Sequence, residues 1–169
     1  NYYGIDLYMS SNCNLYGNTL LNNEYGVWIE TESYFPNNRF FHNNFVDNNQ
    51  HVKIYVGGGY ISGYNFWDNG FEGNYWSNYT GADLDPDGIG NMPHIIIDEN
   101  NTDNHPLMGM FYSFNTSLGY SVDVISNSTI EDFRYFESNS TIKTHVSNTT
   151  TNQTHGFCRL TISHNLLSP

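Results

Sequence analysis

The chain has 169 residues, of which 38% are hydrophobic and 17% aromatic, so it can bury a core in one or two domains. Its 17 acidic and 5 basic residues give a net charge of −12, which repels phosphate backbones and argues against nucleic acid as a partner. No apolar run approaches the about 18 residues of a membrane-spanning helix, so no membrane span is expected.

The opening residues "NYYGIDLY" already have the pattern of a strand and not of a signal peptide, so we expect a processed or partial N-terminus. Two segments then repeat at an offset of 25 residues: "GNTLLNNEYGVWIE" (17–30) and "HNNFVDNNQHVKIY" (42–55). A partial earlier copy, "GIDLY" (4–8), precedes "GVWIE" (26–30) by 22 residues. Short alternating strands without a helical period predict a β-solenoid, in which each repeat forms one coil.

The offset also predicts which residues stack in neighbouring coils. Equivalent positions would lie about 4.8 Å apart, so asparagines at the turns could form hydrogen-bonded ladders while apolar side chains fill the interior. An Asn-rich disordered tract is the alternative, which the regular alternation of hydrophobic residues disfavours. The predicted pairs are Leu15 with Phe40, Asn18 with Asn43, Leu20 with Phe45, Asn23 with Asn48, Val27 with Val52, and Ile29 with Ile54.

Aromatic residues gather at 66–79, after the repeats. They could cap the open end of the solenoid, whose core would otherwise meet water. Alternatively, Trp67, Tyr75 and Trp76 could form a platform on which sugar rings stack, and one surface could serve both purposes.

The coils and the segment "WDNGFEGNYWSNYTGADLDPDGIGNMPHIIIDENNTDNHPLM" (67–108) together resemble the NosD-like right-handed β-helix proteins. These are also grouped as carbohydrate-binding proteins and sugar hydrolases, and they are abundant among archaeal surface proteins. The resemblance covers about residues 1–112, and its closing segment is the specific part. It implies a right-handed parallel β-helix and an extracytoplasmic location, but such proteins differ widely in function, so the fold leaves the function open.

The loop "DLDPDGIGN" (83–91) places three aspartates at alternate positions ahead of a glycine. Such carboxylates can wrap a hard cation such as Ca²⁺, because glycine permits the turn that converges them. His94 stands where an EF-hand has its bidentate glutamate, so another group must complete the shell. The resemblance supports the calcium role, and a solvated acidic turn is the alternative. The predicted ligands are Asp83, Asp85, Asp87, the carbonyl of Ile89, and Asp98, with Asp103 as an alternative to Asp98.

No catalytic residue is predicted. Carbohydrate-active β-helices use paired carboxylates or a carboxylate-bound cation with a base. The offset instead places Glu30 beside Tyr55 and Asp6 beside Trp28. The "NTD" at 101–103 resembles a hydrolase motif but follows the coils, so coincidence explains it better. We therefore expect a protein that is not an enzyme.

Sulfur and imidazole side chains occur in few places. The segment "HPLMGM" offers side chains of the types that bind copper, namely His105, Met108 and Met110. A single cluster without a companion repeat is weak evidence for a copper site, so an apolar connector is the favoured interpretation. Cys13 and Cys158 are too few for a zinc site or a disulfide framework, so two buried free thiols are expected, with a bridge as the alternative.

The composition changes in the second half, where short alternating strands such as "YSVDVIS" and "GFCRLTIS" are typical of a β-sandwich. Only about 50 residues are available for it. The sandwich is therefore small, completed by chain outside this sequence, or completed by a strand from a neighbour. The predicted all-β chain has coils at 1–79, a cation-binding connector at 80–116 and a sandwich at 117–169.

Seven N-glycosylation signals occur, and six of them lie beyond residue 99. Their clustering predicts a glycan-coated surface, although a composition rich in Ser, Thr and Asn also produces such signals by chance. The predicted glycan sites are Asn78, Asn100, Asn115, Asn127, Asn139, Asn148 and Asn152.

The sequence thus predicts an extracellular, cell-surface structural or adhesion protein that carries N-linked glycans and Ca²⁺. A short solenoid exposes its core and its strand edges at the ends, so self-association into a surface layer or filament is expected. The competing interpretation is a carbohydrate-binding or carbohydrate-processing module with a surface polysaccharide as its partner.

Overall fold

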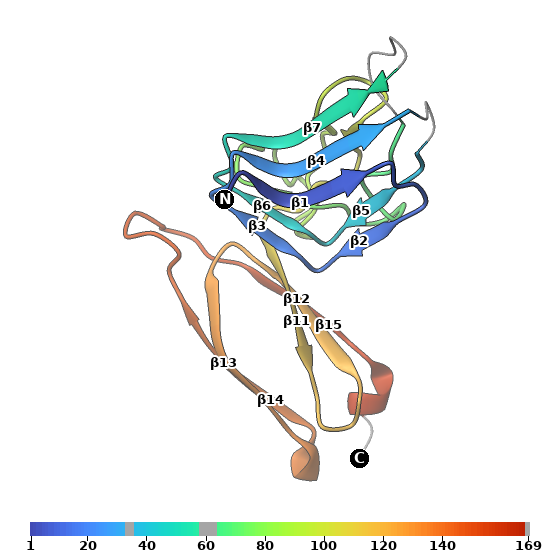
Figure 1. Cartoon of the computed structure of the whole chain (residues 1–169). Coiled ribbons are helices and arrows are strands. Elements are labelled where there is room, and N and C mark those ends of the chain that lie inside the picture. Colours follow the sequence, from blue (N-terminus) through green and yellow to red (C-terminus); the bar gives the residue numbers. More distant parts are fainter. Residues whose placement is uncertain (33–35, 58–63, 168–169) are drawn as a thin grey trace. The chain divides into compact units, whose positions relative to one another are not determined.

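A computed structural model describes residues 1–32, 36–57 and 64–167 (Figure 1). The chain separates into two compact units, Asn1–Leu107 and Met108–Pro169, both built almost entirely from β-strands and turns. Within the described ranges, no helix is both long and apolar enough to cross a membrane.

The boundary between the units falls inside the predicted connector 80–116. Leu107 still forms bridges to Tyr75 and Ile89 of the first unit. From Met110 onward the chain pairs in an antiparallel sheet of the second unit. The acidic loop therefore belongs to the same unit as the coils.

The first unit contains three parallel sheets, to each of which successive passes of the chain contribute one strand (Figure 1). The strands are β1 (Tyr3–Tyr8), β2 (Asn14–Tyr16), β3 (Thr19–Leu21), β4 (Tyr25–Thr31), β5 (Arg39–Phe41), β6 (Asn44–Val46), β7 (Gln50–Val56) and β8 (Tyr75–Trp76). The sheets have the orders β1–β4–β7, β2–β5 and β3–β6–β8. We call each pass a coil. A short antiparallel pair, β9 (His94–Ile95) with β10 (Thr102–Asp103), follows the coils.

The strand register confirms the 25-residue offset: every apolar pair that it predicts is a pair of directly opposed residues. The partial earlier copy is confirmed too, since Ile5 pairs with Val27 and Leu7 with Ile29. Val27, Ile29 and Phe45 are fully buried, so the interior of the coils is a continuous apolar core. Burial of such side chains is the main source of stability here, at about 25 cal/mol per Å².

The longest asparagine ladder runs through Asn18, Asn43 and Asn74. Oδ1 of Asn43 accepts from the backbone N–H (3.2 Å) and Nδ2 (2.9 Å) of Asn18. Oδ1 of Asn74 accepts from the same two groups of Asn43, at 3.1 and 2.9 Å. The ladder ends on a carboxylate, because Oδ2 of Asp103 accepts from the backbone N–H of Asn74 at 2.7 Å. Each rung pairs a turn N–H that would otherwise be buried without a partner.

Two further ladders follow the same rule. Oδ1 of Asn48 accepts from the backbone N–H and Nδ2 of Asn23 at 3.0 and 2.9 Å, as predicted. Oδ1 of Asn65 accepts from the backbone N–H of Asn38 at 3.2 Å. Asn38 in turn accepts from the N–H of Cys13 at 2.9 Å, so the cysteine occupies a rung position in the first coil.

Trp67 and Trp76 continue the stacks of the interior. The ring of Trp67 lies on Phe40 with 4.4 Å between centroids, and that of Trp76 lies on Phe45 with 4.1 Å. Both tryptophans are 1% exposed, which agrees with the cap interpretation. The sugar-stacking role predicted for them is not supported, because a buried ring has no face to offer to a ligand. Tyr75, the third residue of the predicted platform, is half-buried.

The second unit has two antiparallel sheets, β11–β12–β15 and β13–β14. Their bounds are β11 (Met110–Asn115), β12 (Ser121–Ser126), β13 (Thr129–Phe136), β14 (Thr141–Ser147) and β15 (Cys158–Ile162), with 3-10 turns η2 (Glu137–Asn139) and η3 (His164–Leu166). Phe114 of β11 stacks on Phe133 of β13 with 4.4 Å between centroids. Both sheets therefore contribute to one core, which is centred on the buried Val122.

Cys13 and Cys158 are free thiols, as the sequence suggested. Neither is buried, however, because Cys13 is half-buried and Cys158 is exposed. The prediction that both thiols are buried is therefore wrong. Cys13 lies just before β2, where its N–H donates to Asn38, and Cys158 is the first residue of β15.

Candidate functional site

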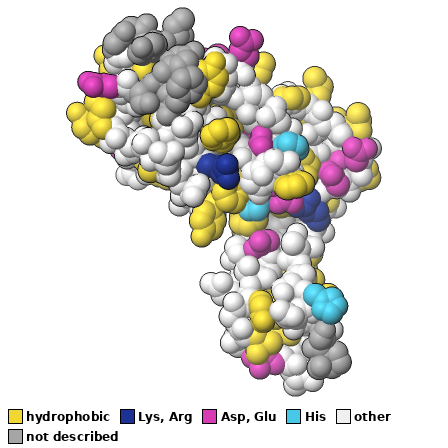
Figure 2. Space-filling view, turned by 90° about the vertical axis from the view of Figure 1, so that its right-hand side faces the viewer, with side chains coloured by type: hydrophobic (Ala, Val, Ile, Leu, Met, Phe, Trp, Pro, Cys, Tyr) yellow, Lys and Arg dark blue, Asp and Glu magenta, His cyan; other side chains and the backbone are white. Residues whose placement is uncertain are grey.

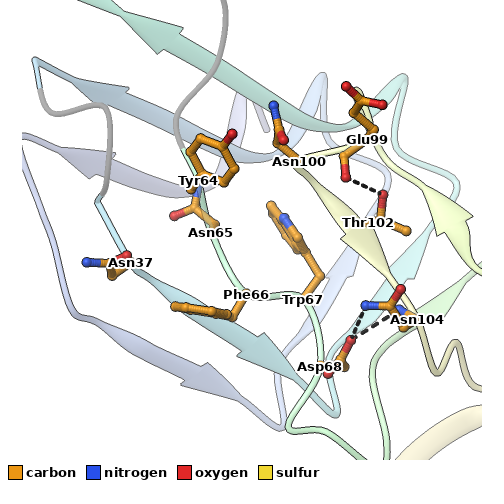
Figure 3. A pocket seen from close by; sticks show the side chains of 10 residues that line it. All are labelled: Asn37, Tyr64, Asn65, Phe66, Trp67, Asp68, Glu99, Asn100, Thr102 and Asn104. Atoms are coloured by element: carbon orange, nitrogen blue, oxygen red, sulfur yellow. Dashed lines mark hydrogen bonds between the residues drawn. The ribbon is translucent and has the colours of Figure 1, made fainter.

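A cavity of about 410 Å³ opens beside the last coil (Figure 3). Aromatic, amide and carboxylate side chains share its wall. The lining residues are Asn37, Tyr64, Asn65, Phe66, Trp67, Asp68, Glu99, Asn100, Thr102 and Asn104. Three segments therefore build it: Asn37 just before β5, residues 64–68 after the coils, and residues 99–104 around β10.

Phe66 and Trp67 have opposite roles in this cavity. Backbone hydrogen bonds of 2.8 Å join Phe66 to Asn38 and to Phe40, so the residue is held against the coil below it. Its ring nevertheless stays 51% exposed, with the guanidinium of Arg39 5.5 Å from the ring centroid. Trp67 is buried, and its Nε1 donates to Oδ1 of Asn101 at 3.1 Å, which ties two of these segments together.

Asp68 is held as an anion. Burial opposes its ionisation, but N–H groups of Asn104 and Gly70 and the nearby His105 outweigh that effect, so its pKa lies below the usual value. Its oxygens accept from Gly70 N–H at 2.8 Å and from the N–H and Nδ2 of Asn104 at 3.1 Å each. A carboxylate held in this way is unsuited to act as a general acid.

Asp103 lies deeper, under the coils, and is 0% exposed. Its Oδ2 accepts from Trp76 Nε1 at 2.9 Å as well as from Asn74, and its Oδ1 accepts from the N–H of His105 at 3.0 Å. Burial raises the pKa of Asp103 to about 6, against the opposing effect of these hydrogen bonds. Its position at the end of a ladder gives it a structural role.

The predicted calcium ligands do not come together as one set. Asp83 accepts from the N–H groups of Asp87 (3.2 Å) and Gly88 (2.8 Å), so its carboxylate closes the loop on itself. Asp85 accepts from Nδ2 of Asn91 at 2.7 Å. Among the residues that the structure describes, no three His, Cys, Asp or Glu side chains form a group that could hold a metal. Calcium binding by this loop stays a prediction.

The two remaining predicted ligands, Ile89 and Asp98, lie in different parts of the first unit. Ile89 lines a cavity of about 350 Å³ together with Asp85 and Asp87, and its backbone N–H donates to Oδ1 of Asp87 at 2.9 Å. Asp98 belongs to another turn, where its Oδ1 accepts from the backbone N–H of Asn100 at 3.0 Å. The carboxylate of Asp98 therefore organises its own turn.

His51 and His94 meet at the edge of Trp76, a pairing that the sequence did not suggest. Their rings lie 5.9 and 5.1 Å from that of Trp76, and both line a cavity of about 480 Å³. Burial lowers the pKa of both imidazoles, so both are neutral near pH 7. They are far apart in the chain and belong to no motif, so only the fold could show their proximity.

The predicted glycan sites differ in how much of the asparagine is accessible. Asn127 is half-buried, and its side chain holds a turn: Oδ1 accepts from the N–H of Phe157 at 2.9 Å and Nδ2 donates to His155 O at 3.3 Å. Asn100 is half-buried as well and lies on the cavity wall in Figure 3. The exposed asparagines are Asn78, Asn115, Asn139, Asn148 and Asn152.

Comparison with known proteins gives one family. Residues 1–81 match the family model described as "Periplasmic copper-binding protein (NosD)". The chain is thus similar to a periplasmic β-helix family over its coils. No curated protein and no solved structure matches the chain.

Proposed function

We propose that the chain is a non-catalytic structural module of an extracytoplasmic surface protein, with a short right-handed parallel β-helix followed by a small β-sandwich. Similarity to a periplasmic family over residues 1–81 supports the location and the β-helix. The observation that carries the structural role is that aspartate carboxylates of the first unit are engaged in hydrogen bonds that hold the fold together. Asp68, Asp98 and Asp103 each accept several hydrogen bonds from the surrounding fold.

Glycoside hydrolysis requires a carboxylic acid with a raised pKa beside a second carboxylate and an accessible substrate. Asp103 has the raised pKa, but it is 0% exposed beneath the coils. Asp68 is accessible from the cavity, but its pKa is lowered. The two requirements are therefore met by different residues, which favours a protein that is not an enzyme.

Copper binding, which the matched family's description carries, is less well supported for this chain. Within residues 1–81 the histidines are His42 and His51. Nε2 of His42 lies 2.6 Å from Glu72, and the ring nitrogens of His51 contact Asn48 and Ser77. Both imidazoles are thus already engaged within the fold.

Self-association is the second part of the proposal. β1, β2 and β3 are each the edge strand of their sheet in the described structure, so a whole coil offers unpaired backbone groups. In the ladders, Oδ1 of each inner rung accepts from the rung before it. Asn18 would accept in the same way from a chain added at this end, and we propose that a second copy of the chain supplies it. Asn23 is not such an outer rung, because β1 pairs with the strand that follows it and the N–H of Glu24 donates to Asn1 O.

Light scattering of the whole chain at several concentrations tests this assembly. Replacing Asn18 by leucine removes the outer acceptor and should shift the distribution towards monomer, because a donor of the second copy would be left without its acceptor. Asn49→Leu is the matched control, since Nδ2 of Asn49 donates to Glu24 within the coils. A monomer at all concentrations, or an equal shift in the control, would contradict the proposal and favour a further coil from the same polypeptide.

Saccharide binding is a second candidate, favoured by the exposed ring of Phe66 among amide and carboxylate groups (Figure 3). The face of the molecule in Figure 2 carries its hydrophobic side chains in several separate places and not in one continuous patch. A glycan array would test this candidate. Binding that disappears in Phe66→Ala but persists in Phe71→Ala, where an exposed ring outside the cavity is removed, would support it.

A further inference from the structure

The N-glycosylation signal at Asn100 differs from the other six because its asparagine lines the cavity of Figure 3. Its backbone N–H donates to Asp98, but its side-chain amide makes no hydrogen bond with any residue in the described ranges. The amide nitrogen is therefore available at the cavity wall. At Asn127, by contrast, the amide holds a turn through Phe157 and His155.

The middle residue of this signal fixes the direction of its neighbour. Asn101 is fully buried, where its Oδ1 accepts from Trp67 and its Nδ2 donates to Asp98 at 3.2 Å. The hydroxyl of Thr102 donates to the carbonyl of Asp98 at 3.3 Å, which closes the same turn. With Asn101 anchored inwards, Asn100 is left on the side of the turn that faces the cavity (Figure 3).

The cavity has the chemistry that a sugar ring requires. A pyranose has an apolar face and a rim of hydroxyl groups, so it binds best where an aromatic ring lies among hydrogen-bonding side chains. Phe66 offers the exposed ring, while Asn37, Asn104 and Glu99 offer amide and carboxylate groups around it. Its volume of about 410 Å³ is within the range of ligand pockets.

We propose that Asn100 carries an N-linked glycan whose sugars nearest the linkage fold back into this cavity and pack against Phe66. A lipid-linked oligosaccharide phosphate would be the donor. The bond from Nδ2 to the anomeric carbon forms, the bond from that carbon to the phosphate oxygen breaks, and one amide proton is released. This proposal rests on the extracytoplasmic location in the proposed function, since such donors act on that side of the membrane.

The glycan then becomes part of the fold. It covers an aromatic ring that is otherwise open to water, and it lies between the turn at 98–104 and the segment that carries Phe66, which both belong to the cavity wall. The 98–104 turn would open less often, because opening would also separate the sugars from Phe66.

Hydrogen exchange of the whole chain, purified from a host that attaches N-glycans, tests this. Glycopeptide mapping should find Asn100 modified, and the amides of residues 98–104 should exchange about fivefold more slowly than in Asn100→Gln. A fivefold change in exchange rate corresponds to about 1 kcal/mol in the free energy of opening the turn. The difference should vanish when Phe66 is replaced by alanine, and it should persist in Phe71→Ala. Asn139→Gln, which removes a signal in the second unit, should leave exchange of the turn unchanged.

Three results would overturn the proposal. They are an unmodified Asn100 where Asn139 is modified, no glycan on any signal, or an exchange difference that survives Phe66→Ala. The first and third of these leave the structural role untouched, because that role is judged separately by light scattering. Conversely, a modified Asn100 in a chain that stays monomeric would contradict self-association and would still support a glycan bound in the cavity.

Discussion

Replacing Asn43 by alanine removes the middle rung of the longest ladder. The side chain is 1% exposed, so water cannot replace what is lost. Its Oδ1 accepts from the backbone N–H (3.2 Å) and Nδ2 (2.9 Å) of Asn18, and its Nδ2 donates to Leu15 O and to Asn74 Oδ1 at 2.9 Å each. The amide has only two protons, so its longer contact with Phe41 O at 3.1 Å shares one of them and is not counted separately. At about 1 kcal/mol for each of these four hydrogen bonds, the free energy of unfolding should fall by about 4 kcal/mol.

The matched control is Asn18→Ala at the outer end of the same ladder. Asn18 is half-buried, and its backbone N–H can still donate to Asn43 after the substitution. Only the side-chain bonds of Nδ2 to Asn43 and to Tyr16 O are lost, partly to water. We expect about 1 kcal/mol of destabilisation, so the two variants should differ by about 3 kcal/mol.

Urea unfolding followed by tryptophan fluorescence measures this difference. The three tryptophans of the chain, Trp28, Trp67 and Trp76, all lie in the first unit, so the signal reports that unit alone. Equal losses in the two variants would refute the reasoning, because they would mean that the ladder contributes no more at its buried centre than at its exposed end.

Three other predictions concern the segment that follows the coils. Because the pKa of Asp103 is raised from 3.8 to about 6 in the folded chain, its contribution to stability is complete below about pH 3.8 and should be lost as pH rises through about 6. At about 1.4 kcal/mol per pKa unit this amounts to roughly 3 kcal/mol, which is measured as the difference between the pH–stability curves of the native chain and Asp103→Asn. Removing Asp85 or Asp87 should lower the melting temperature in millimolar Ca²⁺, as EGTA should for the parent; at a hundredfold excess over Kd the lost stabilisation is up to about 2.7 kcal/mol in the free energy of unfolding, and a melting temperature that does not change with chelator would contradict calcium binding. Gly73→Ala should lower the free energy of unfolding by about 2 kcal/mol or more, because the added Cβ would overlap the carboxylate of Asp103. In the control Gly57→Ala the Cβ would meet nothing closer than 3.3 Å, so thermal unfolding should show a loss of less than about 1 kcal/mol.

The register of the coils could be predicted because a constant offset is a property of the sequence itself. Each inward residue has its partner 25 positions away, so Val27 with Val52 and Asn18 with Asn43 follow by alignment alone. The third ladder escaped this reasoning because Cys13 stands at its first rung and no asparagine repeat is visible there.

Features that depend on irregular spacing could not be predicted. Asn74 and Asp103 extend the ladder at separations of 31 and 29 residues, after the offset of 25 has ended. Aromatic density at 66–79 likewise gave no indication of which rings point inwards, and Trp67 and Trp76 turned out to lie in the core. The cavity is lined by three segments that are distant in the sequence, so none of its geometry was visible in the order of residues.

The carboxylate at the end of the ladder explains why the stack can stop there. An inner rung must accept from the rung before it and donate to a carbonyl or to the next rung, which an amide can do and a carboxylate cannot. The last rung needs only to accept. Asp103 accepts from the Asn74 backbone, from Trp76 and from its own turn at His105, so every strong hydrogen bond that it makes points back into the unit. The two ends of the longest ladder therefore differ: Oδ1 of Asn18 at the first rung remains able to accept, while the opposite end is closed by a residue that can neither donate onwards nor be reached by solvent. In the proposed assembly, the closed end cannot receive a first coil, so two copies would meet at the edges of β1, β2 and β3. The N–H of Asn18 is already paired with Asn43 in each copy, so Oδ1 of Asn18 would accept from other donors of the second copy.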